Sequence, residues 1–583
     1  MSVNGKLNDI VVRIGGEGGE GVMSAGEILT YSAARSSYRV FTFRTFPAEI
    51  KGGLAMYQFR VSPHDIYSMG DKLHILMAFN QEAFDNYASL LADDGVLFYD
   101  PAECKPPESF TKKKYEVPLK ELAMSAGTHL AKNMVATGFL TAVLGIPVEK
   151  SEYQIIDKFK RKGEKILEQN LTAFRSGIEY ANRYLDELSR FKLGEPEGKD
   201  KRIILSGNQA IGFGAIAAGC KVAVGYPITP ASPVLEFLAR YLPRFGGKVI
   251  QNEDEISALA TCIGASYAGV KVITPTSGPG LALMTELITY ASMAELPVII
   301  VDVQRAGPST GMPSKTEQTD LYHAVFGGPG EAPRIVVAPA NVSECFYETV
   351  RAFNLAEEYQ MPVIILSDQI LAYQTEAIPK PDIDSLEVVN RIEPDYDNYN
   401  SEYLRYKITE TGLNPIATPG HPGFEYIAPG LEHNERGNPN YTPKVHTEMQ
   451  KKRFRKLETL AQKLENEDND YYRVDGAEIL LISWGSTYGA IREAIARAEM
   501  EGVKVSHYHP RILNPLPKRK VKGIIQSYKK IIVVEQNYHG QFANILRTFV
   551  DYNPIKLNNY GGIPFTSEEI YNKIIEVANE RSN

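Results

Sequence analysis

A carboxylate stands at the start of a segment that is suited to a dry site. Glu253, Asp254 and Glu255 lead directly into the small, apolar residues 256–269 (ISALATCIGASYAG), which predict a closely packed helix. Acidic residues are common in the first turn of a helix, because the helix dipole favours negative charge there. A carboxylate that faces inward can instead accept or share a proton with a ligand nitrogen. Both interpretations are open from the residues alone.

Residues 225–233 (GYPITPASP) place a hydroxyl on a rigid turn. Three prolines fix the backbone just after the strand-like run 221–224 (KVAV). In open α/β sheets, ligands bind at the carboxyl ends of the strands, so the Thr229 hydroxyl could face a substrate oxygen. The alternative is that Thr229 or Ser232 caps the helix that follows.

Two more loops follow predicted strands. Residues 275–280 (PTSGPG) come after the run KVIT and offer exposed backbone amides. Arg305 comes just after the apolar run 297–303 (PVIIVDV), where its guanidinium could bind a carboxylate, although a structural salt bridge is equally consistent. The nearby GPSTG matches the GxSxG sequence pattern of hydrolases, but its predicted structural context does not fit that pattern. Pro308 and Pro313 place Ser309 in a loop, whereas a nucleophile needs a direct strand-to-helix turn.

Two glycine-rich stretches are weak nucleotide motifs. Residues 15–21 (GGEGGEG) could present backbone N–H groups to an anion, but the two glutamates among them would repel a diphosphate. A tight strand-to-helix turn is therefore favoured there. Residues 207–220 (GNQAIGFGAIAAGC) have small residues at helical spacing and predict a helix packed closely on a sheet, with residues 206–208 as the surface feature.

Three segments must position these loops. Each alternates short β-branched runs with helical patterns, which predicts an α/β fold of three domains with parallel sheets. The predicted domains are residues 1–190, 203–380 and 476–583. Residues 191–202 are charged and punctuated by Gly and Pro, as in a linker, and residues 381–475 form an extended insertion rich in Pro, Gly, Asn and Tyr.

The composition and net charge of the chain argue against some classes of function. The chain has 583 residues and a formal net charge of −8, which argues against nucleic-acid binding. The basic run 450–456 (QKKRFRK) is flanked by acids and is interpreted as a solvated helix face. No stretch approaches the ~20 apolar residues of a membrane span, and the first residues lack a signal-peptide pattern, so we expect no membrane partner and a cytoplasmic protein.

Cysteine and histidine usage predicts no metal in this chain. The four cysteines stand alone without a CxxC pair, and the ten histidines show no ligand spacing. Iron–sulfur clusters and structural zinc sites usually take several ligands from closely spaced motifs. Isolated cysteines also suit a reducing compartment.

Together these stretches resemble the alpha subunits of the 2-oxoacid:ferredoxin oxidoreductases. GYPITPASP is close to that family's most specific signature. The Glu255 helix, TSGPG, QRAGPSTGMPSKTEQTD and EQNYHGQ follow in the family's order. The first 190 residues resemble the family's gamma subunit, here fused to the N-terminal side of the alpha subunit. The stretches GGEGGEGVMSAGEIL, FPAEIKGG and KNMVATG carry this resemblance.

The resemblance implies roles for the domains and for particular residues. Residues 1–190 would be a gamma-type domain, 203–380 the pyrimidine-binding domain of a thiamine-diphosphate enzyme, and 476–583 a transketolase C-terminal-like domain. By position, Glu255 matches the glutamate that contacts the thiamine aminopyrimidine. The other implied assignments are Pro227 and Ile228 beside the cofactor, Thr229 and Arg305 around the carboxylate and keto group of the substrate, Ser314 at the variable end of the oxoacid, and Lys51, Gly52 and Gly53 at CoA.

The implied reaction is the oxidative decarboxylation of a 2-oxoacid with CoA, with ferredoxin as the electron acceptor. The fused arrangement looks most like 2-oxoglutarate enzymes, so we expect succinyl-CoA as the product, with pyruvate or a branched-chain oxoacid as the alternative. The chain has no GDG motif and no cluster cysteines. A beta subunit would therefore supply the diphosphate site, Mg²⁺ and a 4Fe–4S cluster, in an α2β2 assembly. A non-catalytic CoA-binding scaffold and a transketolase-like transferase are the alternatives of a different class.

Overall fold

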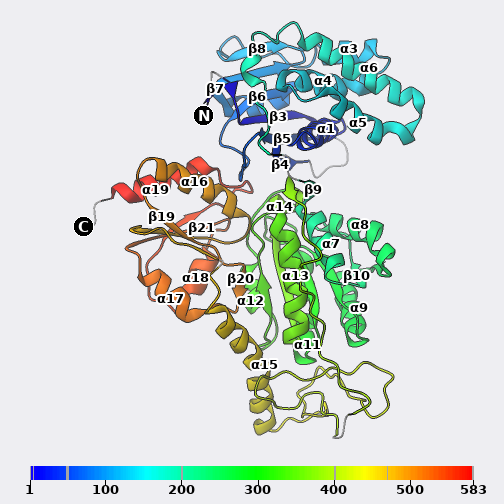
Figure 1. The fold of residues 1–583 in the computed structure, drawn as a ribbon, viewed down its shortest axis with the longest axis vertical. Helices are drawn as coiled ribbons and strands as arrows, with labels where there is room; N and C mark the ends of the chain where they lie inside the picture. Colours follow the sequence, from blue (N-terminus) through cyan, green and yellow to red (C-terminus); the bar gives the residue numbers. More distant parts are fainter. Residues whose placement is uncertain are drawn as a thin grey trace. The chain divides into compact units, whose positions relative to one another are not determined.

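The computed structural model describes residues 2–3, 6–46, 52–198, 201–398, 402–468 and 470–580. These residues form two compact units (Figure 1). Unit 1 comprises Met1–Leu205, Tyr373–Lys380 and Thr566–Glu568, and unit 2 comprises Ser206–Ala372, Pro381–Phe565 and Glu569–Asn583. Residues 373–380 thus belong to unit 1, although they are far in sequence from the N-terminal residues that form most of that unit.

Unit 1 is built on a mixed sheet of eight strands. In spatial order these are β8 (Lys113–Glu116), β7 (Leu91–Tyr99), β6 (Leu73–Ala78), β3 (Ile10–Glu17), β5 (Leu54–Ser62), β4 (Arg39–Thr45), β16 (Thr375–Pro379) and β9 (Arg202–Ser206). Strands β3, β6, β7 and β8 are parallel, whereas β5 is antiparallel to both β3 and β4. The expectation of a parallel sheet is wrong here, because β5 was not recognised as a strand and runs back between its neighbours.

The α-helices of unit 1 include α1 (Val22–Ala34), α2 (Gln81–Tyr87), α3 (Leu119–Ser125), α4 (Lys132–Leu144), α5 (Val148–Phe159) and α6 (Glu164–Ala181). Helices α4 and α6 cross where each has a glycine. A Cβ at Gly138 would stand 1.9 Å from the carbonyl oxygen of Phe174, and one at Gly177 would stand 2.1 Å from that of Val135. The close approach lets the two helices bury their apolar faces against each other.

Unit 2 contains a seven-stranded sheet that is parallel except at one edge. Its order is β11 (Lys248–Gln251), β10 (Val222–Gly225), β12 (Val272–Thr276), β13 (Val298–Gln304), β15 (Pro362–Asp368), β14 (Ile335–Val337) and the antiparallel β20 (Ile512–Asn514). From β10 the chain crosses to β11 on one side, and from β12 it crosses to β13 on the other. The connections therefore diverge at the crevice between β10 and β12, which is where open α/β sheets bind ligands.

A second sheet of unit 2 comes from the last part of the chain. Its order is β17 (Tyr471–Tyr472), β19 (Val505–Tyr508), β18 (Ile479–Ile482), β21 (Lys530–Glu535) and β22 (Ile555–Asn558). Strand β20 leaves this region to join the seven-stranded sheet, and the only tryptophan, Trp484, is fully buried in a core that both sheets share. The two α/β segments therefore form one compact unit.

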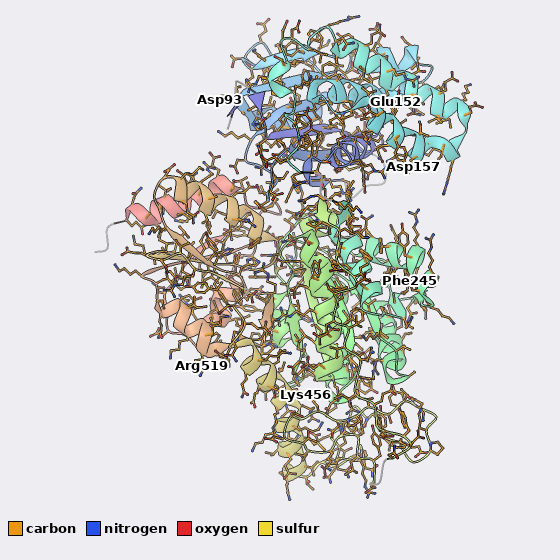
Figure 2. The ribbon with its side chains drawn as sticks, viewed as in Figure 1. Asp93, Glu152, Asp157, Phe245, Lys456 and Arg519 are labelled. Atoms are coloured by element: carbon orange, nitrogen blue, oxygen red, sulfur yellow. The ribbon has the colours of Figure 1, made fainter. Side chains whose placement is uncertain are left out.

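The insertion ends in a long helix that the sequence did not reveal. Described residues between 381 and 442 contain no helix or strand, and α15 (Pro443–Leu464) follows them. Lys456 lies where α15 meets the rest of unit 2 (Figure 2). The expectation of a solvated basic face is wrong, because the side chains of Lys452, Arg453 and Lys456 are only 0%, 3% and 1% exposed.

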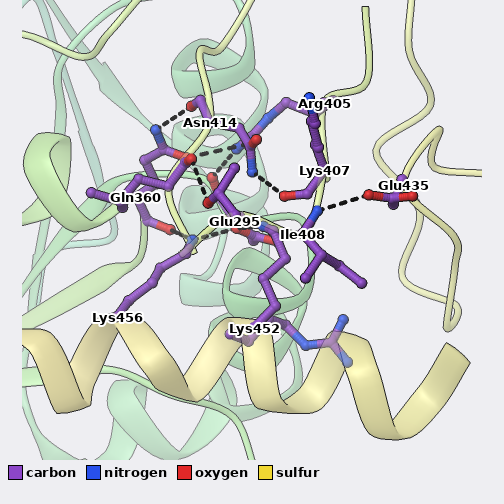
Figure 3. Close-up of polar contacts among 12 residues, drawn as sticks. Glu295, Gln360, Arg405, Lys407, Ile408, Asn414, Glu435, Lys452 and Lys456 are labelled. Atoms are coloured by element: carbon purple, nitrogen blue, oxygen red, sulfur yellow. Dashed lines mark hydrogen bonds and ion pairs between the residues drawn. The ribbon is translucent and has the colours of Figure 1, made fainter. Parts of the chain in front are cut away.

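Two of these buried cations, Lys452 and Lys456, converge on the carboxylate of Glu295 (Figure 3), whereas Arg453 pairs with Glu432. The Nζ atom of Lys452 lies 2.7 Å from each carboxylate oxygen of Glu295, and Lys456 pairs with the same group. Arg405 from the insertion donates to the backbone oxygen of Glu295 at 2.7 Å. The insertion is thus held to the domain by ionic contacts, and the basic residues point inward because their partner lies inside.

Three general properties of the described residues bear on function. None of their helices combines the length and the apolar character that a membrane crossing would require. Nowhere in the described part of the chain do three or more His, Cys, Asp or Glu side chains gather as metal ligands. The four cysteines are buried as free thiols.

Candidate active site at the carboxyl edge of the seven-stranded sheet

The loops singled out in the sequence meet at one edge of the unit 2 sheet. Residues 226–231 follow β10, helix α9 (Glu255–Tyr267) follows β11, residues 277–280 follow β12, and Arg305 follows β13. Since these strands are parallel, their carboxyl ends lie at the same edge. The loops singled out in the sequence therefore do lie together at one edge of the sheet.

Glu255 is the one acid of its group that turns inward. Asp254 caps α9 by accepting the backbone N–H of Ser257 at 2.7 Å, and both Asp254 and Glu253 are exposed. The Glu255 side chain is instead buried, with the residue 5% exposed. Asp254 therefore caps the helix, while its neighbour Glu255 points inward.

Gly280 fixes the position of the Glu255 side chain. A Cβ at Gly280 would stand 2.6 Å from both Cγ and Oε1 of Glu255, so only glycine allows this approach. Among the described residues none donates a hydrogen bond to the Glu255 carboxylate. A buried carboxylate without a protein donor is costly unless a ligand supplies the donor.

Arg305 and Thr229 lie next to each other. The Nη1 atom of Arg305 donates to the backbone oxygen of Thr229 at 2.7 Å, and Arg305 is 7% exposed. Burial lowers the pKa of Arg305, and the nearby Asp320 opposes that change. Within the described residues Arg305 forms no salt bridge, which disfavours a purely structural role.

The capping alternative for residues 229–232 is partly excluded. Helix α8 (Ser232–Tyr241) has Ala231 at its N-cap without a side-chain cap, and the Ser232 hydroxyl donates back to the oxygen of Ile228 at 3.1 Å. The hydroxyl of Thr229 has no hydrogen-bond partner among the described residues and stays half-buried. It is available to a ligand.

The loop between β13 and α12 (Leu321–Phe326) is held by the last part of the chain. Gln318 donates its backbone N–H to Gln536 at 2.7 Å, and Gln541 donates its side-chain amide to the oxygen of Thr319 at 2.7 Å. The EQNYHGQ stretch therefore positions the KTEQTD stretch. Ser314 lies half-buried in the same loop.

Ser309 is not placed as a nucleophile. It lies in an exposed turn, and eleven residues separate it from the start of helix α12 at Leu321. A nucleophile elbow would instead place a helix directly after the serine. The structure therefore agrees with the expectation that GPSTG matches a hydrolase pattern by letter only.

Several buried polar atoms around this edge have no hydrogen-bond partner. They are the Oδ1 atom of Asn208, the hydroxyls of Thr274, Ser277 and Thr316, and the Nε atom of Arg305. Such orphan groups are rare in a folded protein and indicate that something else completes them.

Asn208 is not among the predicted site residues, because residues 206–208 are expected from the sequence to form a surface feature. That expectation is wrong. Ser206 forms a capping box with Gln209 at the start of α7 (Gly207–Ala217), and Asn208 is fully buried. Its side-chain amide donates to the oxygen of Pro230 at 2.8 Å, which supports the proline turn. The sequence signal that could have identified Asn208 as buried is the Asn-Gln pair two residues after the capping serine.

The N-terminal glycine-rich loop in unit 1 is built as a tight turn. Glu20 forms an ion pair with Lys132 and accepts the backbone N–H of Glu17 at 2.7 Å. The backbone N–H of Gly18 donates to the oxygen of Gly53 at 2.9 Å, so this loop and Gly52–Gly53 are neighbours. Lys51, the third residue suggested for CoA, lies outside the described residues.

Comparison with protein families matches three models along the chain. Residues 11–180 match "Pyruvate ferredoxin/flavodoxin oxidoreductase". Residues 213–452 match "Pyruvate flavodoxin/ferredoxin oxidoreductase, thiamine diP-bdg", and residues 477–569 match "Pyruvate:ferredoxin oxidoreductase core domain II". The thiamine-diphosphate-binding model covers every residue of the site at the sheet edge except Asn208 and the supporting EQNYHGQ stretch.

Curated relatives and a solved structure share most of this length. The chain is 34% identical to "2-oxoglutarate oxidoreductase subunit KorA" of Mycobacterium tuberculosis, over 97% of this chain and 91% of that protein. It is 31% identical to "2-oxoacid:ferredoxin oxidoreductase 2, subunit alpha" of Aeropyrum pernix, over 98% and 99%. A 2-oxoglutarate:ferredoxin oxidoreductase from Magnetococcus marinus, solved with 2-oxoglutarate, coenzyme A and succinyl-CoA bound, matches with a TM-score of 0.92 and 41% identity, covering 98% of this chain and 100% of that chain.

Proposed function

Since the chain belongs to the alpha subunits of the 2-oxoacid:ferredoxin oxidoreductases, we propose that its substrate is 2-oxoglutarate. With CoA and two oxidised ferredoxins, the products are succinyl-CoA, CO₂, two reduced ferredoxins and one proton. The names of the relatives and the 2-oxoglutarate bound in the similar solved structure support this substrate over pyruvate or a branched-chain oxoacid. The chain also carries the thiamine-binding domain that this chemistry needs.

The observation that carries the proposal is the buried Glu255 carboxylate without a protein donor beside Gly280. Bound thiamine diphosphate supplies the carbon nucleophile and the electron sink for decarboxylation. Glu255 holds a proton at the aminopyrimidine nitrogen. Pro227 and Ile228, on the rigid turn after β10, line the cofactor.

Arg305 and Thr229 act on the substrate side of the same site. The Arg305 guanidinium keeps its Nε atom free of protein partners and is positioned through Thr229, so it binds the substrate carboxylate. The Thr229 hydroxyl donates to the keto oxygen. Ser314, in the loop that also carries Arg305, contacts the far end of the oxoacid and contributes to the choice among substrates.

A beta subunit completes the site. Exposed apolar side chains lie on the strand, loop and helices that form this part of the sheet edge: Tyr226 (42%), Ile250 (38%), Ile256 (46%) and Leu283 (52%). Apolar rims of this kind are typical of surfaces that a partner covers. The partner contributes the diphosphate site, Mg²⁺ and the 4Fe–4S cluster that passes electrons to ferredoxin, in an α2β2 assembly.

CoA binds near Lys51, Gly52 and Gly53. The neighbouring loop 15–21 supports this assignment, since its Glu20 carboxylate is neutralised by Lys132 and does not repel an anionic ligand. The backbone of Gly52 and Gly53 allows a close approach. A Lys51→Ala variant should raise the KM for CoA and leave the KM for the oxoacid unchanged; an unchanged KM for CoA contradicts the assignment.

A substrate panel tests the proposed function. The chain is produced together with its beta subunit, and reduction of a viologen dye is followed with CoA and with 2-oxoglutarate, pyruvate or a branched-chain 2-oxoacid in turn. We expect the largest kcat/KM for 2-oxoglutarate. A larger value for another oxoacid overturns the substrate, and no activity with any oxoacid favours a non-catalytic scaffold.

A further inference from the structure

The turn that carries Thr229 is held by two side chains that lie outside it. The backbone oxygen of Thr229 accepts a hydrogen bond from Nη1 of Arg305 at 2.7 Å. The next backbone oxygen along the chain, that of Pro230, accepts one from Nδ2 of Asn208 at 2.8 Å. Two successive carbonyls are thus held from two different elements of unit 2, the loop after β13 and the first turn of α7.

The third carbonyl of the turn is held from within. The backbone oxygen of Ile228 accepts the N–H groups of Ala231 at 2.8 Å and Ser232 at 3.0 Å. The peptide planes that carry the oxygens of residues 228, 229 and 230 are therefore each fixed by a hydrogen bond. The side chain of Thr229 leaves the backbone between the first two of these planes, so its direction is fixed with them.

Asn208 holds its carbonyl from a rigid base. It is the second residue of α7 and is 0% exposed. The first turn of α7 is closed by the capping box, in which the backbone N–H of Gln209 donates to Oγ of Ser206 at 3.3 Å and that of Ser206 donates to Oε1 of Gln209 at 2.9 Å. A Cβ at Gly207 would stand 2.1 Å from the backbone oxygen of Leu371, so the turn is also packed directly against backbone.

Packing alone does not account for an amide at this position. The Oδ1 atom of Asn208 is buried and has no hydrogen-bond partner among the described residues. A buried amide with an unpaired oxygen lowers stability, and an apolar side chain would fill the same space without that cost. The contact that the amide makes, with the carbonyl of Pro230, is the contribution that an apolar side chain could not supply.

We propose that Asn208 is a positioning residue that fixes the Thr229 turn, so that the Thr229 hydroxyl and the Arg305 guanidinium face the substrate together. This role rests on the proposed function, which assigns both of those groups to the oxoacid. Without the amide, the buried carbonyl of Pro230 would turn toward another donor, and the peptide planes beside Thr229 would turn with it. A misplacement of about 1 Å can cost about a hundredfold in rate.

A double-mutant cycle tests this role in the complex of this chain with its beta subunit. Asn208→Ala should lower kcat/KM for 2-oxoglutarate about tenfold or more in the presence of Thr229. Thr229→Val keeps the branched shape but has no hydroxyl to position, so in that background the loss caused by Asn208→Ala should be smaller by a factor of about three or more. A purely structural role makes the two losses equal. A ratio of the two losses below about three overturns the proposal.

Two further variants separate positioning from general damage to the fold. Asn414→Ala is the matched control, because Asn414 is also buried and its Nδ2 atom donates to the backbone oxygen of Lys407 at 2.8 Å, in the insertion. It should keep the wild-type kcat/KM, and a loss as large as that of Asn208→Ala overturns the special role of Asn208. Asn208→Asp keeps the side-chain volume and puts a negative charge at a helix start, where the helix dipole favours it, but removes the donor. It should show the same coupling to Thr229→Val, and it replaces Asn208→Ala in the cycle if that variant does not fold.

Hydrogen exchange reports on the turn without any turnover. The backbone amides of Ala231 and Ser232 should exchange about fivefold faster or more in Asn208→Ala, and at the wild-type rate in Asn414→Ala. Unchanged exchange in Asn208→Ala overturns the proposal even if the complex turns over no oxoacid, whereas that inactivity by itself refutes the proposed function. Thr229→Val alone distinguishes the two further. If it leaves kcat/KM unchanged, the assignment of Thr229 to the substrate fails, and if it lowers kcat/KM without coupling to Asn208→Ala, only the positioning role fails.

Discussion

The buried ionic cluster under α15 gives a prediction that is independent of the active site. Glu295 is the single carboxylate there, and it faces Lys452, Lys456 and Arg405, all of them buried. Lys452 already occupies both carboxylate oxygens at 2.7 Å. One carboxylate thus faces three buried cations, and burial lowers the pKa of Lys456 to about 7, an effect that Glu295 opposes and Lys452 and Arg405 reinforce.

The sign of the pH effect follows from proton binding. The Lys456 ammonium has a pKa near its ordinary value of 10.5 in the unfolded chain and about 7 in the native state. Between these values the unfolded chain binds more protons, so the stability of unit 2 rises with pH. At about 1.4 kcal/mol per pKa unit, the free energy of unfolding should rise by roughly 2 kcal/mol between about pH 7 and about pH 9.

Lys456→Met should make that rise smaller, and the part contributed by Lys452, whose pKa burial lowers to about 8, should remain. Urea unfolding of unit 2 can be followed by the fluorescence of Trp484, the only tryptophan of the chain. Lys451→Met, an exposed lysine one turn away on the same helix, is the matched control and should keep the wild-type pH dependence. Equal pH dependence in the wild type and Lys456→Met would refute the reasoning, because it would mean that Lys456 keeps an ordinary pKa in the native state.

Two further predictions concern the site. Gly280→Ala would place a methyl group 2.6 Å from Oε1 of Glu255 and should lower kcat for viologen reduction about tenfold or more. The control Gly523→Ala, which lies in open space on α17 (Lys518–Gln526), should have no effect on kcat. Full activity of Gly280→Ala would contradict the contact between Gly280 and Glu255. Arg305→Lys keeps the charge but loses the planar fork, so the KM for the oxoacid should rise about tenfold with a smaller change in kcat, and an unchanged KM would contradict carboxylate binding.

The position of the site could be predicted because it depends on local pattern. Short β-branched runs followed by GYPITP, TSGPG and Arg305 predict strand-end loops, and parallel strands bring such ends together. The inward-facing acid was also open to prediction, since three acids before an apolar helix cannot all cap it. That Glu255 is the inward one follows from helix geometry, with Asp254 taking the N-cap.

The ionic cluster under α15 could not be predicted in the same way. Its two sides, Glu295 and Lys452, are 157 residues apart, and no local pattern marks them as partners. A weaker signal was present in the helix itself. Met449, Leu460 and Leu464 recur at helical spacing and share one face with Arg453 and Lys456, so the basic residues fall on the apolar side of the helix. Strand β5 could not be predicted for a similar reason, since its position in the sheet depends on the antiparallel strands β3 and β4 on either side of it.

We expect Glu255 to control a proton on bound thiamine diphosphate, and two glutamine variants test this role. Glu255→Gln and its exposed neighbour variant Glu253→Gln differ by two positions and by burial, and both are assayed with the beta subunit, 2-oxoglutarate, CoA and viologen. Removal of a positioned proton-transfer group typically costs a factor of about 10² to 10⁴, so Glu255→Gln should lose at least about 99% of kcat while Glu253→Gln keeps the wild-type rate. A Glu255→Gln complex that retains more than about a tenth of the wild-type rate would contradict the account.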